Sequence, residues 1–313
     1  MSAPAAKPRP AFVYHPDYFA QIGVHVFPIE KYPGTKKDLI DRGDTTPEEW
    51  IEPPNATVEQ LLLVHTKAYL DDFLHCRLTP RTSFSEFPLT AGIVKAYVRG
   101  AGGTIVACRE ALARGFAANC GGGFHHAFAD MAAGFCYLND IAIGIRVLQQ
   151  EGKIARAAVV DCDLHQGNGT ARIFEGDDSV FTFSIHQENL YPVKERSDWD
   201  IGLEDHAGDA RYLDELSRAL PQVMERARPD FVVYQAGADP FEEDQLGDLG
   251  ITRAGLLERD RLVLSECARR GIPCAVTLGG GYARRLADTV AIHAGTLRTM
   301  LQVSGHAGSA RPA

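Results

Sequence analysis

The chain has 313 residues, of which 45% are hydrophobic, and its formal net charge at pH 7 is −9. Such a chain can bury the core of one large α/β domain or of two ordinary domains, and its acidic balance excludes a basic surface for nucleic acid or for anionic lipid. The sequence contains no apolar run long enough to span a membrane and no secretory signal near its start. We therefore expect a cytoplasmic protein whose partners include neither nucleic acid nor a membrane.

Short apolar runs alternate along the chain with longer segments of helical spacing. Strands are predicted at residues 11–15, 115–120, 156–161, 179–185, 230–236 and 272–278. Helices are predicted at residues 90–113, 137–151, 209–227, 253–270 and 285–302. The alternation favours a parallel sheet flanked by helices, with function at the carboxyl ends of the strands.

The segments outside this pattern are expected to contribute little to the core. The proline-rich and acidic stretch 41–56 is predicted to be a surface loop, and the tails 1–10 and 304–313 are predicted to be flexible. No internal repeat or long linker divides the remaining residues, 11–303. We interpret these residues as one structural unit.

Unusual polar residues follow four of the predicted strands. In chain order they are His125 and His126, then Asp161, Asp163 and His165, then Asp239, and last Tyr282. A single aspartate in such a turn is more often a helix cap, and a histidine pair alone is more often a satisfied core feature. Because the ends of parallel strands meet at one edge of a sheet, the convergence of all four sets favours a functional site.

Asp163 and His165 have the spacing of metal ligands. Side chains two residues apart in an extended segment point the same way, so these two can share one ion, with Asp239 as a third ligand. Three protein ligands with one position left for water are typical of a catalytic zinc site, and the same donors accept Fe(II). The alternative is a buried network of aspartate–histidine hydrogen bonds without a metal.

Six ordered motifs between about residues 120 and 282 carry a family resemblance. They are "GGGFHHA", "GFCYLND", "DCDLHQGNGT", "FSIH", "AGADP" and "GGGY". This set resembles the zinc-dependent histone deacetylase family, and its forms are most similar to the class IV branch and its bacterial relatives. The resemblance implies a single-domain arginase/deacetylase fold of the α/β class, with a mostly parallel eight-stranded sheet and helices on both faces. It also implies a deacetylase catalytic domain at residues 11–303.

The resemblance also implies a role for individual residues. Zinc would be bound by Asp163, His165 and Asp239, and catalysis would use His125, His126, Tyr282, Asp161 and Asn168. Potassium would be held by Asp161, Ser184 and Ile185 with the backbone of Asp163 and His165, and the substrate tunnel would be bordered by Gly134, Phe135 and Tyr191. His126 would act as the general base, His125 as a protonated support, and Tyr282 as a donor to the oxyanion.

Two positions depart from related patterns. Asn168 stands where class I deacetylases carry an aspartate, and an amide orients an imidazole without stabilising its charged form by a full negative charge. Gly167 stands where the two-manganese sites of arginases carry a carboxylate, which favours a single catalytic metal. The resemblance implies that the substrate is an acylated lysine in a protein or peptide, with acetyl or a longer fatty acyl as the group removed.

Two other functions use the same residues. An acetylpolyamine amidohydrolase would act on small acylated amines, and the acidic stretch 241–245 could attract them, although we interpret this stretch as a solvated surface loop. A non-catalytic acyl-lysine binding module is the third hypothesis, and His125, His126 and Tyr282 argue against it. Acyl-chain length and oligomeric state are not determined by the sequence.

Overall fold

The computed structural model describes residues 8–306. Within these residues the strands are β1 (Ala11–Val13), β2 (Trp50–Ile51), β3 (Phe116–Asn119), β4 (Ala157–Asp161), β5 (Val180–Gln187), β6 (Trp199–Leu203), β7 (Phe231–Gln235) and β8 (Cys274–Thr277). The α-helices are α1 (Lys31–Asp41), α2 (Val58–Leu61), α3 (Lys67–Leu74), α4 (Ala91–Arg114), α5 (Asp140–Gln150), α6 (Asn168–Phe174), α7 (Asp209–Ala227), α8 (Arg253–Arg270) and α9 (Leu286–Val303). Short 3-10 helices lie at Pro16–Tyr18, Pro47–Glu49 and Ser83–Ser85.

The strands form one eight-stranded sheet in the order β2-β1-β3-β8-β7-β4-β5-β6. Every pairing between neighbours is parallel. The four strands that precede the predicted site residues, β3, β8, β7 and β4, are therefore consecutive in the sheet and end at the same edge. This confirms the predicted α/β architecture and the convergence of the site residues on one edge.

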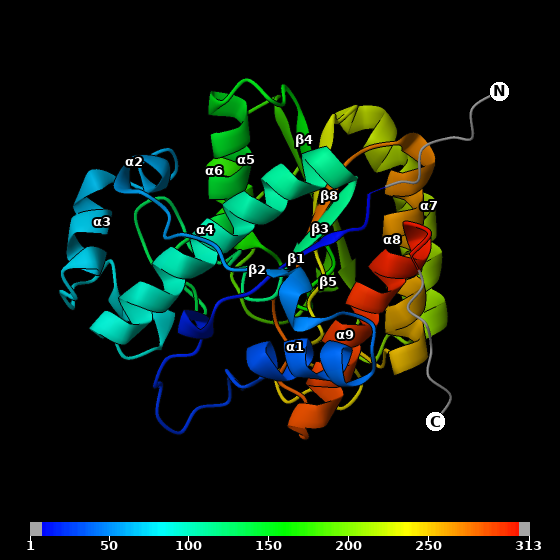
Figure 1. Ribbon diagram of the computed structural model, residues 1–313, viewed down its shortest axis with the longest axis horizontal. Coiled ribbons are helices and arrows are strands. Elements are labelled where there is room, and N and C mark those ends of the chain that lie inside the picture. Colours follow the sequence, from blue (N-terminus) through cyan, green and yellow to red (C-terminus); the bar gives the residue numbers. More distant parts are fainter. Residues whose placement is uncertain (1–7, 307–313) are drawn as a thin grey trace.

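Helices cover both faces of the sheet (Figure 1). Val159, Val233 and Ala275 point to one face, where they pack with residues of α4, α5 and α6. The next residues along these strands, Val160, Tyr234 and Val276, point to the opposite face and share a core with α7, α8 and α9. The central strands are buried throughout, which explains why they read as continuous apolar runs.

All the predicted strands and helices are present, with ends that differ by a few residues. The stretch 41–56 was predicted wrongly as a surface loop, because it contains a 3-10 helix and the edge strand β2, whose Trp50 is 6% exposed. The other edge strand, β6, was not predicted. Only its last residue, Leu203, is buried, so its sequence forms no clear apolar run. Short edge strands depend on pairing with a neighbour more than on their own composition.

The ends of the chain are only partly described. Arg9, in the first predicted tail, forms an ion pair with Glu49 through atoms 2.7 Å apart. Residues 1–7 and 307–313 lie outside the described residues, so the flexibility of the tails stays a prediction. Among the described helices, none combines the length and apolar character that crossing a bilayer requires.

A buried ion pair connects α8 to the strand ends that carry the site. Arg259 is fully buried and donates hydrogen bonds to the carbonyl oxygens of Cys162, at 3.2 Å, and Gly237, at 2.5 Å. It also pairs with Asp260 at 2.9 Å. Asp260 in turn accepts a hydrogen bond from Tyr234 on β7, at 2.5 Å. The backbone that follows β4 and β7 is therefore held by a side chain from a distant helix.

Replacing Arg259 should destabilise the fold strongly. Arg259→Met leaves Asp260 without its cation and two buried carbonyls without a donor, so the free energy of unfolding should fall by about 3 to 5 kcal/mol. Urea denaturation followed by circular dichroism measures this change. Arg261→Met is the matched control, because its pair with Glu258 is exposed and should contribute less than about 1 kcal/mol. Equal losses for the two variants would contradict the role of Arg259.

Candidate active site

Asp163, His165 and Asp239 form a buried cluster beyond the ends of β4 and β7. One possible ligand atom from each residue lies within 4.8 Å of the other two. The Nδ1 atom of His165 is 3.2 Å from Oδ2 of Asp239 and 3.4 Å from Oδ1 of Asp163. The side chains are at most 8% exposed. Within residues 8–306, this is the one group of three or more such side chains that could hold a metal ion.

Backbone contacts fix the two carboxylates of the cluster. Asp163 accepts hydrogen bonds from the backbone N–H groups of Gly280, at 2.9 Å, and of His165, at 3.1 Å. Asp239 accepts one from the backbone N–H of Leu164 at 3.0 Å. The carboxylates therefore keep their positions before any ion binds, which is the preorganisation that a metal site requires.

Glycines allow the chain to pass close behind these carboxylates. A Cβ atom on Gly237 would lie 2.2 Å from Oδ2 of Asp163, and one on Gly280 would lie 2.0 Å from Oδ2 of Asp239. Any side chain at these positions would displace the carboxylates. The donor set, its burial and this glycine cradle fit a divalent cation of the zinc or iron type.

The electrostatics of the cluster favour positive charge. Burial by itself lowers the pKa of His165, but the hydrogen bonds and charges of Asp163 and Asp239 outweigh this effect and raise the pKa to about 10. A cation bound by the same atoms would replace the proton, because metal ligands bind as the deprotonated imidazole and carboxylate.

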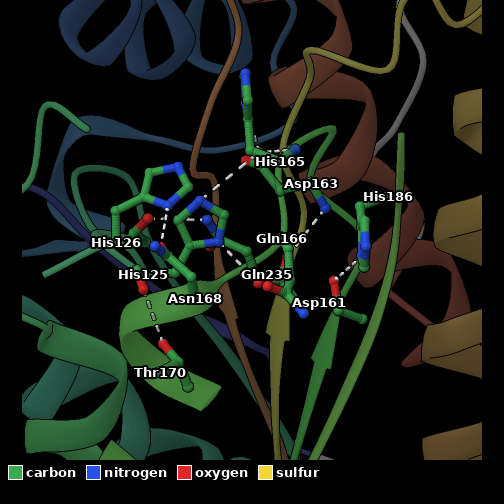
Figure 2. Close-up of polar contacts among 12 residues, drawn as sticks. His125, His126, Asp161, Asp163, His165, Gln166, Asn168, Thr170, His186 and Gln235 are labelled. Carbon is green, nitrogen blue, oxygen red and sulfur yellow. Dashed lines mark hydrogen bonds and ion pairs between the residues drawn. The ribbon is translucent and has the colours of Figure 1, made fainter. Parts of the chain in front are cut away.

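The adjacent histidines have different partners (Figure 2). Nδ1 of His125 lies 2.7 Å from Oδ2 of Asp161, and Nδ1 of His126 lies 2.8 Å from Oδ1 of Asn168. Their ring centroids are 4.1 Å apart. Because the amide oxygen of Asn168 can only accept a hydrogen bond, Nδ1 of His126 carries the proton and Nε2 is left as the basic atom.

The two partners separate the pKa values of the pair. Burial lowers the pKa of His125, but the carboxylates of Asp161 and Asp163 outweigh it and raise the pKa to about 9. The pKa of His126 is lowered well below its ordinary value by burial and by the positive charges of His125 and His165. Near neutral pH, His125 is therefore protonated and His126 is neutral.

Tyr282 lies beside the cluster on the loop that follows β8. Its ring centroid is 6.5 Å from that of His165 and 5.8 Å from those of Phe27 and Phe135. Burial, followed by the negative charges of Asp239 and Asp163, raises its pKa well above the ordinary value. Tyr282 is thus a protonated hydroxyl donor at any physiological pH.

A pocket of about 190 Å³ leads from the surface to this group. It is lined by residues that the sequence motifs singled out, His126, Gly134, Phe135, His165, Tyr191 and Tyr282. A Cβ atom on Gly134 would lie 2.7 Å from the hydroxyl of Tyr191 and from Cδ2 of His126. The pocket is therefore narrow where Gly134 and Tyr191 face each other.

The residues named for potassium lie on neighbouring strands. Asp161 on β4 and Ser184 on β5 are directly paired in register, and Ile185 follows Ser184. Oγ of Ser184 is 2.8 Å from Nδ1 of His186. This arrangement brings Asp161 and Ser184 side by side, and potassium binding there stays a prediction.

Some residues around the site were not found from the sequence. Glu86, Leu190 and Leu246 also line the pocket, and they come from loops without a motif. Lys31 is fully buried and donates from Nζ to the carbonyl oxygen of Gly279 at 2.9 Å. Gln235, a polar residue at the end of the apolar strand β7, donates to the carbonyl of Gly123 at 2.8 Å and could have been found from its position.

The acidic stretch 241–245 is only in part the solvated loop that we predicted. Glu242, Glu243 and Gln245 are exposed, but Phe241 and Asp244 are buried. Asp244 accepts hydrogen bonds from backbone N–H groups, and burial raises its pKa to about 7. The buried carboxyl of Asp244 therefore contacts the backbone of Leu246 and Tyr282, two residues that line the pocket.

Gly167 borders the His125–Asp161 pair. A Cβ atom at this position would lie 2.4 Å from Oδ2 of Asp161 and 3.1 Å from Nδ1 of His125. A carboxylate side chain at position 167 would therefore disrupt this pair. That the site holds one catalytic metal rather than two stays a prediction.

Known proteins share both the sequence and the fold. The histone deacetylase domain family matches residues 25–297. An uncharacterized protein from Picosynechococcus sp. is 42% identical over 284 residues, covering 90% of this chain and 95% of its own length. Histone deacetylase 2 from Arabidopsis thaliana is 31% identical over 282 residues, with coverages of 85% and 73%. The crystal structure of an HDAC homolog from Aquifex aeolicus has a TM-score of 0.81 at 25% identity, with coverages of 95% and 84%.

The eight-stranded parallel sheet and its site place the protein in the arginase/deacetylase superfamily. Within it, the chain belongs to the histone deacetylase family. This confirms the resemblance drawn from the six motifs. Family membership supports a hydrolase of the deacetylase type.

The protonation of His125 should depend on Asp161. In the metal-free protein we expect His125 to titrate near pH 9, and in Asp161→Asn we expect its pKa to fall toward or below the ordinary value of about 6.5. NMR of ring-labelled histidine measures both values. Since the folded-state pKa exceeds the unfolded one, protonated His125 stabilises the fold fully below about pH 6.5, and this contribution is lost as pH rises toward 9. A wild-type His125 that titrates below pH 7 would contradict this electrostatic account.

Proposed function

We propose that the protein is a metal-dependent deacylase that removes acetyl or other acyl groups from lysine side chains of proteins or peptides. The products are the free amine and a carboxylate. One observation carries the proposal: a pocket of about 190 Å³ is lined by His126, His165 and Tyr282 next to the buried Asp163–His165–Asp239 cluster. A ligand set, a base and a hydroxyl donor thus meet around the position of one scissile amide.

In this proposal Asp163, His165 and Asp239 hold zinc, or alternatively Fe(II), because both accept carboxylate and imidazole ligands. When bound, the ion polarises the acyl carbonyl and lowers the pKa of water. The protein's own contribution is to hold the three side chains in fixed positions, and a bound ion would replace the proton on His165. Their buried positions and backbone hydrogen bonds support this role.

The histidine pair would move the protons. Nε2 of His126 takes a proton from the attacking water and later gives it to the leaving amine. Asn168 keeps the ring of His126 in the required tautomer through its 2.8 Å contact with Nδ1. His125, protonated beside Asp161, supplies a fixed positive charge near the developing negative charge.

Tyr282 would stabilise the oxyanion. Its hydroxyl makes no hydrogen bond with any other group in residues 8–306, so it is available to substrate. The donation strengthens as the carbonyl oxygen becomes negative, and such donors contribute more in a buried site than in water.

Potassium and class IV membership are further parts of the proposal. A monovalent cation bound by Asp161, Ser184 and Ile185 with the backbone of Asp163 and His165 would offset the buried charge of Asp161. The strand register that pairs Asp161 with Ser184 supports this site. The motif forms "DLHQGNGT" and "AGADPFEEDQ" support assignment to the class IV branch.

We expect a short acyl group to be the preferred one. The pocket volume of about 190 Å³ is below the ~300 to 1,000 Å³ of typical sites for drug-sized ligands.

A small acylated polyamine is the second candidate substrate, and one observation favours it. Glu86 is exposed and lines the pocket, where its carboxylate would attract a cationic amine.

Turnover on a substrate panel tests the function. The panel contains an acetyl-lysine peptide, a long-chain acyl-lysine peptide and an acetylpolyamine, each assayed with zinc-loaded protein and with a chelator. We expect the acetyl-lysine peptide to give the highest kcat/KM, and the chelator to abolish turnover. Faster turnover of acetylpolyamine would favour the second candidate, and binding without any turnover would favour the non-catalytic module.

Tyr282→Phe should lower kcat about 100- to 1,000-fold, because the oxyanion loses its donor. The metal content, measured by atomic emission, should stay that of the wild type. Tyr14→Phe is the matched control: Tyr14 is buried outside the pocket, so loss of its hydroxyl should leave kcat unchanged. A Tyr282→Phe protein with wild-type kcat would remove Tyr282 from the mechanism.

Asn168→Asp should change the pH dependence. A carboxylate beside Nδ1 raises the pKa of His126, so the base is deprotonated only at higher pH. The acidic limb of the kcat/KM profile should therefore move to higher pH, as a pH–rate series on one peptide would show. A limb that stays in place or moves to lower pH would mean that His126 is not the base.

A further inference from the structure

Tyr282 lies at the end of a glycine-rich chain segment. Tyr282 follows three glycines, and Gly279 and Gly281 have φ angles of +55° and +143°. Glycine is the residue that fixes its own backbone least. A donor to an oxyanion must nevertheless be aimed to within a fraction of an ångström, since a misplacement of about 1 Å can cost about 100-fold in rate. Other residues must therefore supply the rigidity.

Two consecutive side chains from the loop after β7 bind the backbone of Tyr282 on both sides. The backbone N–H of Tyr282 donates to Oδ2 of Asp244 at 2.7 Å. Nε2 of Gln245 donates to the carbonyl oxygen of Tyr282 at 2.7 Å. Both peptide groups of the residue are thus fixed by segment 241–245.

Asp244 is itself held in place. It is 6% exposed, and its second oxygen accepts a hydrogen bond from the backbone N–H of Leu246 at 2.9 Å. Asp244 also forms an isolated antiparallel bridge with Ala283. Its two carboxylate oxygens therefore connect the pocket-lining residue Leu246 with the residue that carries the phenol.

Among residues 8–306, no side chain forms a comparable hydrogen bond with the phenol of Tyr282. Its neighbours are the aromatic rings of Phe27, Phe135 and His165, and Nζ of Lys31 lies 5.2 Å from its centroid. These contacts confine the plane of the ring. They do not set how far the hydroxyl extends along the pocket, which depends on the position of the backbone.

We propose that Asp244 and Gln245 are positioning residues for the reaction, acting through the backbone of Tyr282 to aim its hydroxyl at the oxyanion. The inference rests on the proposed deacylase function. It gives the acidic stretch 241–245 a role within the active site, in place of attraction of cationic amines or a purely solvated loop.

Asp244→Asn and Gln245→Glu keep the side-chain sizes and remove one acceptor and one donor, respectively. In the zinc-loaded full chain we expect each to lower kcat about 10- to 100-fold, with KM for an acetyl-lysine peptide within about twofold of wild type. Glu243→Gln is the matched control, because Glu243 is an exposed acid of the same stretch and should leave both constants unchanged.

A double-mutant cycle separates positioning from a general structural effect. In a Tyr282→Phe background, Asp244→Asn and Gln245→Glu should each lower kcat less than about twofold, because the group that they aim is already absent. An equal factor in both backgrounds would overturn the inference, and so would wild-type kcat in both single variants. If Asp244→Asn does not fold, the Gln245→Glu cycle decides alone.

A spectroscopic readout accompanies the kinetics. Fluorotyrosine placed at position 282 should give one sharp fluorine resonance in the otherwise wild-type protein, and a shifted or broadened one with Gln245→Glu, whether or not zinc is present. An unchanged resonance would overturn the inference. If the wild-type enzyme hydrolyses none of the acyl substrates, the proposed function fails; if it is active and the cycle is additive, only the positioning role fails.

Discussion

The site depends on the burial of negative charge at one edge of the sheet. Asp161, Asp163 and Asp239 are each at most 3% exposed. Asp161 is the last residue of β4, Asp163 follows it, and Asp239 follows β7, the neighbour of β4 in the sheet. A buried carboxylate without a positive partner is unfavourable by several kcal/mol. His125 and His165 supply positive charge, and in the proposed enzyme a bound cation takes the place of the proton on His165. The same requirement therefore shapes the ligand set and keeps His125 protonated.

His125 and His126 differ in the side chain that contacts each ring, and this difference gives them different protonation states. His125 and His126 are adjacent in the chain and their rings are 4.1 Å apart, but a carboxylate contacts the first and an amide contacts the second. The carboxylate raises the pKa of His125, while burial and neighbouring positive charge lower that of His126. Environments that move two pKa values apart distinguish an electrostatic support from a base.

Residues outside the candidate active site hold the side chains of that site in place. Arg259 on α8 donates hydrogen bonds to the carbonyls of Cys162 and Gly237, which follow the two strands β4 and β7 that precede the candidate ligands. Asp244 contacts the segment that follows a third strand. Such contacts keep the strand ends in fixed relative positions, which catalysis by preorganised groups requires.

The sequence by itself determined the sheet, the helices that flank it and the polar residues at its edge. Apolar runs and helical spacing are local signals, and candidate ligands such as Asp163 and His165 lie close together in the chain. Only the tertiary structure decided which distant groups meet. The contact of Asp244 with Tyr282 spans 38 residues, and that of Arg259 with Cys162 spans 97. Buried charges find such partners through packing of the whole chain, and no local pattern records that packing.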